Sequence, residues 1–410
     1  MKNLPISDVV TAKKQQSADT KSHDRSFSQI YGDPLLISKA KGSKLYGADK
    51  KEYIDFCLSD GAHILGHAPQ IVLDAVEDVL WDGKSYGMST IEESDLSNLI
   101  SRTVPSMEQV HVVNSDTEAV LGAIRLSHLI TGKKKIITFN DGLLLNHGVM
   151  SISDSPLENV DQTINLTFND ELLVFETFAR YKDEIAAVVV EPVLASMGVI
   201  LPKEGFLQFL RNITQQFHAL LIFDEITTGF RPKIGGAQSY FDIRPDITIL
   251  GKIMGGGFPI GAYGSSKEML HSIAVKDGNY HDGIFAGNPI AVTAGIAAIQ
   301  RLHSPLFYET LNHKSRDFIF WLKEITKGKG IVINSFQSMF TMFFTENEIH
   351  NFEDAKKSDM ARFEKFFRKS LDNGLYFAPS QFNANFISAA HLPEDLNKTL
   401  EIVYQILKTL

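Results

Sequence analysis

The sequence predicts an α/β fold in which a mostly parallel sheet is flanked by helices, with a smaller α+β domain beside it. From about residue 110 to about residue 290, short apolar runs alternate with segments of helical periodicity, which is typical of a parallel sheet covered on both faces. Beyond residue 288, long amphipathic helices with short strands between them indicate a separate unit. The chain of 410 residues is also longer than one hydrophobic core usually supports.

These changes of pattern divide the chain into three segments. Residues 1–60 are predicted to form an N-terminal arm and a part of the small domain, residues 61–287 the large domain, and residues 288–410 the C-terminal small α+β domain. Residues 1–25 are rich in Lys, Gln, Ser, Asp and Thr. They form either a loose tail or an arm that a partner subunit orders.

Hydrophobic periodicity predicts the individual elements in chain order. Residues 44–56 are typical of two alternating strands around a Gly/Asp turn, and residues 71–81 of an amphipathic helix. The large segment is expected to contain strands at 110–113, 135–139, 186–190 and 220–223 and helices at 117–130, 171–181 and 207–217. The last segment is expected to contain helices at 289–302, 308–327 and 354–372 and a strand at 339–344.

Composition and charge argue against several classes of function. A net charge of −9 without a basic face argues against nucleic-acid binding. Cys57 is the single cysteine, which excludes an internal disulfide and fits a reducing cytosol. No segment reaches the length of a membrane span, and residues 1–25 lack an apolar leader. We therefore expect an unprocessed cytoplasmic protein without a membrane partner. The histidines show no metal-ligand spacing, so we expect no metal site.

The most informative stretch is residues 219–264. Its apolar opening is of the kind that forms a strand buried on both faces, and this run ends on the carboxylate of Asp224. Lys252 stands between Gly251 and a run of three glycines, where a backbone can pass close to a ligand. Separately, such an Asp is often a helix cap and such a Lys a loop residue. Together, a buried acid and a lysine able to form a Schiff base are the minimum equipment for pyridoxal phosphate chemistry.

The same stretch resembles the class III aminotransferases of fold type I, and within them the glutamate-1-semialdehyde aminomutase branch. The resemblance extends from about Ser22 to about His391. It implies a pyridoxal-phosphate-dependent enzyme of the fold type I architecture, a cofactor site in the large domain, and a homodimer whose active site lies at the subunit interface. The shared motifs are Asp224-Glu225, Thr228-Gly229-Phe230-Arg231, Gly235-Gly236-Ala237-Gln238, Pro245-Asp246 and Gly251-Lys252.

The resemblance assigns roles to individual residues. Lys252 is implied as the covalent Schiff-base anchor and as the base that moves the substrate proton, and Asp224 as the partner of the pyridinium nitrogen. Ile226 stands where the family places a branched side chain against the ring. The phosphate is expected on Ser115, Asp116 and Thr117, because a helix starts there and its free N–H groups bind anions.

Three departures from the family concern the cofactor. Asp116 stands where the family has Gly, and its carboxylate would repel a phosphate. The stacking aromatic is missing, since Leu143 or Asn146 takes its place according to the gap chosen. Ile284 replaces a Thr that the neighbouring subunit supplies to the phosphate. These changes predict that pyridoxal phosphate, or its pyridoxamine form, is held more weakly, by a few kcal/mol at roughly one per lost hydrogen bond.

Further departures concern the substrate. Arg25 matches the family arginine that reaches the substrate carboxylate, although the alternative is a surface arginine in a tail. Asp60 replaces the Trp of the aminomutase branch, Asn383 replaces its substrate-facing Glu, and the segment 150–165 is shorter than its gating loop.

We therefore predict an aminotransferase, aminomutase-like, that uses a small-molecule amino donor and acceptor, one of them a carboxylate-bearing amine or its aldehyde or keto partner. The alternatives are a true glutamate-1-semialdehyde 2,1-aminomutase and a catalytically impaired family member that serves as a binding or scaffold protein. The retained Asp224 and Lys252 favour an enzyme, whereas the altered cofactor contacts favour the scaffold.

Overall fold

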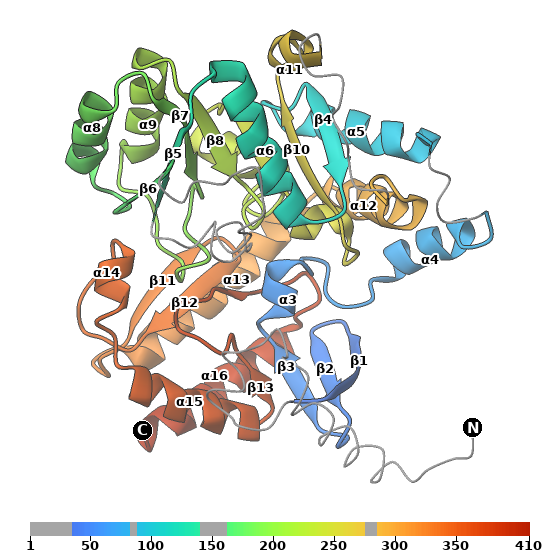
Figure 1. Ribbon diagram of the computed structural model, residues 1–410. Coiled ribbons are helices and arrows are strands. Elements are labelled where there is room, and N and C mark those ends of the chain that lie inside the picture. Colours follow the sequence, from blue (N-terminus) through green and yellow to red (C-terminus); the bar gives the residue numbers. More distant parts are fainter. Residues whose placement is uncertain (1–34, 83–87, 140–161, 275–284) are drawn as a thin grey trace, which may run out of the picture.

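A seven-stranded sheet forms the centre of the larger part of the molecule (Figure 1). The computed structural model describes residues 35–82, 88–139, 162–274 and 285–410. The strand order is β4-β10-β9-β8-β7-β5-β6, and β10 alone runs antiparallel to both of its neighbours. The expected mostly parallel sheet is therefore confirmed. The strands are β4 (Gln109–Val113), β5 (Lys135–Phe139), β6 (Thr163–Leu166), β7 (Ile185–Val190), β8 (Leu220–Asp224), β9 (Ile247–Leu250) and β10 (Gly261–Ser265).

Helices cover both faces of this sheet because successive strand residues point to opposite sides. Val189 and Ile222 pack into one apolar cluster with α6 (Asp116–Thr131). Val188, Val190, Leu221 and Phe223 pack into another cluster with α8 (Glu171–Arg180) and α9 (Phe206–Gln216). Both faces of β7 and β8 are thus buried, as expected of near-continuous apolar runs.

The smaller part of the molecule lies below the seven-stranded sheet in Figure 1. It contains a four-stranded sheet, β1-β2-β3-β13, and a three-stranded sheet, β11-β12-β14. Strand β13 runs parallel to β3, which joins the N-terminal and C-terminal segments of the chain. The strands are β1 (Ile37–Lys41), β2 (Lys44–Gly47), β3 (Glu52–Asp55), β11 (Val332–Phe336), β12 (Met339–Phe343), β13 (Leu375–Tyr376) and β14 (Asn385–Phe386).

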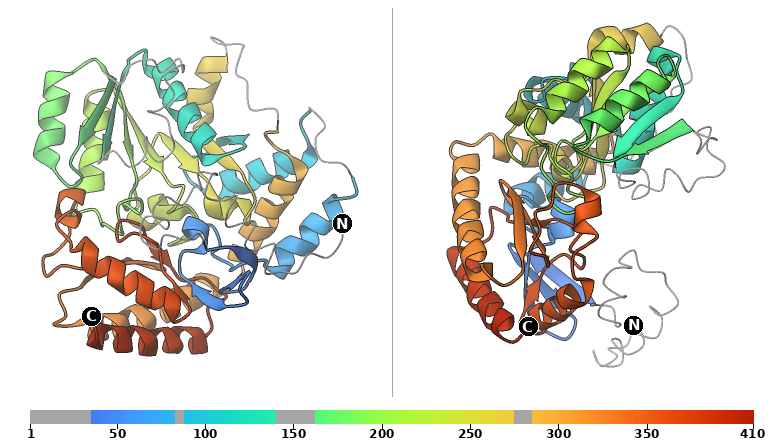
Figure 2. Two further views of the ribbon diagram at one scale, coloured as in Figure 1. Left: turned by 60° about the horizontal axis from the view of Figure 1, so that its bottom comes forward. Right: turned by 90° about the vertical axis from the view of Figure 1, so that its left-hand side faces the viewer.

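Long helices flank these smaller sheets, and their C-terminal members lie at the bottom of the molecule in both views of Figure 2. They are α13 (Phe307–Thr326), α15 (Met360–Asp372) and α16 (Pro393–Lys408). The expected helix at 354–372 is in fact two helices, because α15 begins afresh after α14 (Phe352–Ala355). Asp359 caps the new start by accepting the N–H of Arg362 at 2.9 Å.

The helices α4 (Gln70–Val79), α5 (Ile91–Thr103) and α12 (Pro289–Leu302) lie together at one side of the molecule (Figure 1). Helix α12 packs against both α4 and α5. It follows residue 288 in the sequence, yet its neighbours belong to the segment 61–287. The boundaries at residues 60 and 287 stay predictions. In the described ranges, no helix is both long and apolar enough to cross a membrane.

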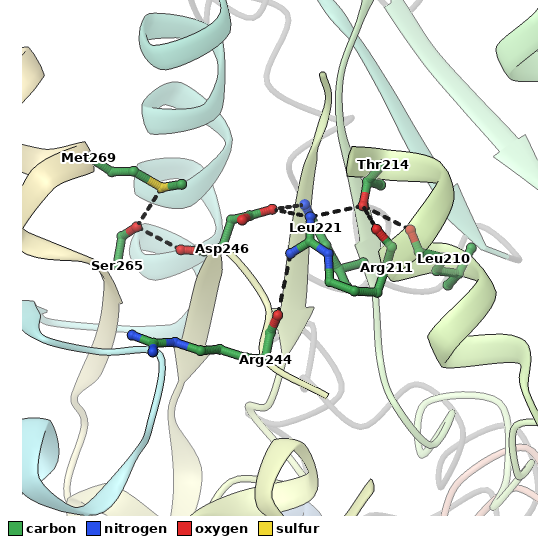
Figure 3. Close-up of polar contacts among 8 residues, drawn as sticks. All are labelled: Leu210, Arg211, Thr214, Leu221, Arg244, Asp246, Ser265 and Met269. Carbon is green, nitrogen blue, oxygen red and sulfur yellow. Dashed lines mark hydrogen bonds and ion pairs between the residues drawn. The ribbon is translucent and has the colours of Figure 1, made fainter. Parts of the chain in front are cut away.

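The strands β8 and β9 are fastened at the ends where they begin (Figure 3). Arg211 of α9 forms an ion pair of 2.9 Å with Asp246, which precedes β9. The same carboxylate oxygen of Asp246 accepts the N–H of Leu221 in β8 at 2.7 Å, and Ser265 of β10 donates to the Asp246 carbonyl at 2.6 Å. Asp246 thus ties α9, β8 and β10 together at the edge opposite Asp224.

Candidate active site

Asp224 ends β8 at the carboxyl edge of the sheet. Asp224 is 3% exposed, and its Oδ1 accepts the N–H of Ile226 at 2.8 Å. Burial raises the pKa of Asp224 well above its usual value, and the nearby carboxylate of Glu191 raises it further, while the positive charge of Lys252 acts in the opposite direction. The strand therefore delivers an acid into an apolar environment, where a cationic partner stabilises it.

Lys252 follows β9 and begins the short helix η3 (Lys252–Gly255). Its φ of 48° lies in the left-handed region, which is rare for a residue with a side chain and is characteristic of functional sites. Its Nζ donates to the Oγ1 of Thr227 at 3.0 Å. A Cβ placed on Gly251 would lie 3.4 Å from both the Cβ of Asp116 and the Cγ2 of Ile226. The backbone at Gly251 therefore lies close to both residues.

The start of α6 brings the expected phosphate residues to the same edge of the sheet. Ser115 is the N-cap, and its Oγ accepts the N–H of Glu118 at 3.2 Å. Asp116 accepts the N–H of Thr117 at 2.8 Å, and its negative charge contributes to the raised pKa of Asp224. The helix thus uses two of its first N–H groups for its own side-chain caps, and a carboxylate stands among them.

Glu191 also lies at this candidate site, although no shared motif contains it. It follows β7 directly and is 8% exposed. Its negative charge raises the pKa of Asp224, and the positive charge of Lys252 opposes the rise that burial causes in the pKa of Glu191 itself. The signal was present in the sequence, because an apolar run that ends on an acid occurs both at Val190-Glu191 and at Phe223-Asp224. Thr227, the partner of the Lys252 amine, was also missed.

Two shared motifs stabilise the structure beside the site. Glu225 is fully buried and accepts N–H groups of Ala237 and Gln238 at the start of α10 (Gly236–Phe241). Burial raises the pKa of the Glu225 carboxyl, and hydrogen bonds from Gln238 oppose that shift. These contacts explain the Asp-Glu and Gly-Gly-Ala-Gln motifs without giving Glu225 a role at the cofactor.

Arg231 connects the site to the small sheets. It is fully buried, and its Nε donates to the Thr227 carbonyl at 3.0 Å. Its Nη2 donates to the carbonyl of Gly61, and its guanidinium lies 4.5 Å from the ring centroid of Phe386. Burial lowers the pKa of Arg231 to about 9. The arginine therefore ties the loop after Asp224 to both α3 (Leu58–Gly61) and β14.

The expected substrate residues are only partly described. Asp60 is exposed in α3, which lies against η3 and β14, and its φ of 53° places it in the left-handed region. Asn383 is half-buried, and its carbonyl accepts the Thr341 hydroxyl at 3.3 Å. The substrate residue Arg25 lies outside the described residues, and so do residues 150–161 of the shortened segment. The same holds for three residues expected at the cofactor, which are Leu143, Asn146 and Ile284.

The described residues at this edge of the sheet suit the ring of pyridoxal phosphate, but one of them would repel its phosphate. Buried carboxylates at 191 and 224, an aliphatic side chain at Ile226 and the Lys252 amine suit a cationic ring and its aldehyde carbon. At the phosphate end, Ser115 offers a hydroxyl and α6 its start, but Asp116 adds negative charge. The donor set therefore accepts the group, with an unfavourable contact at one end.

The fold is that of the pyridoxal-phosphate-dependent transferases of fold type I. An omega-transaminase from Sphaerobacter thermophilus has the same fold, with a TM-score of 0.88 over 97% of each chain and a sequence identity of 26%. The chain belongs to the class III aminotransferase family, because the profile described as Aminotransferase class-III matches residues 27–403. Membership confirms the expected enzyme class and its pyridoxal phosphate cofactor, and it counts against the scaffold alternative.

Curated relatives within this family are similar over nearly the whole chain. A protein of Thermodesulfovibrio yellowstonii named glutamate-1-semialdehyde 2,1-aminomutase is 43% identical over 415 residues, covering 97% of each sequence. One from Persephonella marina with the same name is 42% identical and covers 92% of each. A solved glutamate-1-semialdehyde aminomutase from Pseudomonas aeruginosa, in complex with PMP, has a TM-score of 0.82 at 22% identity over 92% of this chain and 88% of that one, which is a likeness of fold.

Proposed function

We propose that this chain transfers amino groups on a small carboxylate-bearing amine, or on its aldehyde or keto partner, with Lys252 as the residue that holds pyridoxal phosphate. The observation that carries the proposal is the convergence of Asp224, from the end of β8, and Lys252, from the loop after β9, at one buried edge. When bound, the cofactor supplies the electron sink for the carbon that loses its proton.

In this proposal each residue of the site has a distinct task. Asp224 keeps the ring nitrogen protonated, because a buried carboxylate needs a cationic partner. Ile226 packs against the ring face and excludes water from it. Thr227 orients the Lys252 amine through its hydrogen bond of 3.0 Å. Once free of the cofactor, that amine would be the base that takes the proton from the reacting carbon of the substrate.

Other residues would select the substrate. We propose that Arg25 binds the substrate carboxylate and that Asp60 and Asn383 face the rest of the substrate. The exposure of Asp60 and its position in α3, against η3, support its part. Ser115 and Thr117 would hold the phosphate, more weakly than usual because of Asp116.

A second candidate is glutamate-1-semialdehyde 2,1-aminomutase itself, which the two relatives with 43% and 42% identity favour. One assay separates the candidates. The purified chain, supplied with pyridoxal phosphate or the pyridoxamine form, is given glutamate-1-semialdehyde alone, or glutamate together with a panel of aldehyde and keto acceptors. Isomerisation without a second substrate identifies the mutase, and turnover that requires the pair identifies the transaminase. No turnover in either arm would contradict both candidates.

We further propose a cytoplasmic homodimer whose active site both subunits complete. Large apolar side chains are exposed after the end of α4, before and at the start of α5, and before the start of α12, where a second copy would cover them. They are Trp81, Met88, Ile91 and Phe285, with exposed fractions of 88%, 81%, 78% and 60%. Ile284, beside Phe285, is the residue that the family resemblance assigns to the neighbouring subunit's phosphate site.

A further inference from the structure

Glu191 and Asp224 are neighbours at the edge of the sheet. Strands β7 and β8 are parallel, and Val190 pairs with Phe223 at their ends. The next residue on each strand is the acid, so the two backbones stand side by side at about the 4.8 Å spacing of neighbouring strands. This adjacency follows from strand register and does not depend on a flexible loop.

Both acidic side chains point to the same face of the sheet. Val189 and Ile222 lie in the apolar cluster that α6 covers. Glu191 and Asp224 each follow two residues later, and side chains two residues apart share a face. The register thus places both carboxyls on the face that α6 covers, where the negative charges of Glu191 and Asp116 both raise the pKa of Asp224.

Glu191 is held firmly by its own loop. One carboxylate oxygen accepts the N–H of Ala195 at 2.9 Å and the N–H of Ser196 at 3.4 Å, and the other accepts the Ser196 hydroxyl. Lys252 is the cation that acts on both Glu191 and Asp224. Burial raises the pKa of both carboxyls, and two adjacent buried acids beside a single cation do not both ionise readily.

We propose that Glu191 is a positioning residue which forms with Asp224 a carboxyl pair that holds one proton while the cofactor is absent. The inference rests on the proposed function. In the presence of the cofactor, the pair would give up this proton to the basic ring nitrogen, and both carboxyls would then be ionised beside a cationic ring. Glu191 would act through Asp224 and Lys252 rather than through contact with the reacting atoms, because its negative charge would favour positive charge at the Lys252 nitrogen.

The substitution Glu191→Gln tests this role because it preserves the loop. The amide oxygen of Gln accepts the two N–H groups, and its NH₂ donates to the Ser196 hydroxyl, which rotates to accept it. Loss of the charge lowers the pH midpoint at which the visible absorbance of bound pyridoxal phosphate titrates, by about one unit or more. Ser196→Ala, the matched control, removes one hydrogen bond from Glu191 but keeps its charge, and its midpoint stays near that of the unmodified protein.

Three outcomes would overturn the inference: a Glu191→Gln protein that binds pyridoxal phosphate with an unchanged midpoint, an equal shift in Ser196→Ala, or an opposite shift. A protein without any absorbance band that depends on Lys252 would instead contradict the proposed function. The two failures are therefore distinguishable.

A measurement on the unmodified protein covers the case in which Glu191→Gln does not fold. The infrared difference spectrum between the cofactor-free and the cofactor-bound protein at neutral pH should show loss of one protonated carboxyl on binding. The infrared absorbance of the buried Glu225 carboxyl should be the same in both states and cancel in the difference, because Glu225 has its own hydrogen-bond network apart from the pair. Absence of that loss would also overturn the inference.

Discussion

At the scale of single residues, Asp116 is the residue expected to distinguish the phosphate site of this chain. Its carboxylate occupies the start of α6, where it takes the Thr117 N–H at 2.8 Å and adds negative charge beside Asp224. A dianionic phosphate at the same place meets this charge at close range. The residue therefore provides a physical reason for a cofactor that binds reversibly.

We predict that Asp116→Gly binds pyridoxal phosphate about 10-fold more tightly or better. The substitution removes the charge that repels the phosphate and frees the Thr117 N–H, and each change is worth roughly 1–2 kcal/mol. Fluorescence titration of the cofactor-free protein measures the change. Asp116→Asn keeps the side chain's size without its charge, so it should recover most of the gain. Unchanged or weaker binding in both variants would show that the carboxylate does not face the phosphate.

The sequence alone singles out some residues of this sheet edge and not others, for physical reasons. Asp224 and Lys252 are predicted as site residues because each stands in a local pattern, an apolar run that ends on an acid and a lysine among glycines. Glu191 has the first of these patterns too, but its meaning depends on β7 lying next to β8. Strand adjacency is a long-range property, and a single sequence does not display it.

At the scale of elements, the largest differences from expectation also reflect long-range pairing. Strands β9 and β10 were not predicted, because their short runs acquire their role only by pairing with β8 and β4. The break after α14 depends on one cap, Asp359, within a continuous helical pattern. By contrast, β8 and α12 were predicted within one or two residues, since both have strong local periodicity.

The contacts of Asp246 with Arg211 of α9 and with Leu221 of β8 lead to a prediction at this scale (Figure 3). The Arg211 and Asp246 side chains are 12% and 17% exposed, so Arg211→Leu leaves a largely buried carboxylate without its cation. We expect a loss of about 1–3 kcal/mol in the free energy of unfolding, measured by urea denaturation. Arg244→Leu is the control, because its pair with Glu108 is 57% and 46% exposed and should contribute less than about 1 kcal/mol. Equal losses in the two variants would contradict the assignment of Asp246 as the fastening point.

At the scale of the whole molecule, the active site lies where the large sheet meets the smaller sheets. Arg231 and α3 connect the edge that carries Asp224 to β14. The pairing of β13 with β3 returns the C-terminal segment to the N-terminal one. The sequence indicated two packed units but not these connections, because they join residues hundreds of positions apart.

Exposed apolar side chains between the end of α4 and the start of α5, Trp81 among them, predict assembly. We expect sedimentation velocity to show a dimer at micromolar concentration, and Trp81→Glu to shift it toward the monomer, because a charge would be buried in the contact. Leu172→Glu, at a residue 67% exposed on α8, is the matched control and should remain dimeric. A monomeric unmodified protein, or dissociation by both substitutions alike, would contradict this interface.

The measurement that tests the account most directly is the absorbance spectrum of the purified protein with added pyridoxal phosphate, beside Lys252→Ala, before and after addition of glutamate. We predict a visible band that requires Lys252, develops at higher cofactor concentration than is usual because of Asp116, and bleaches with the amino donor. No band that depends on Lys252 at any cofactor concentration would contradict the assignment of the site at the edge formed by β8 and β9.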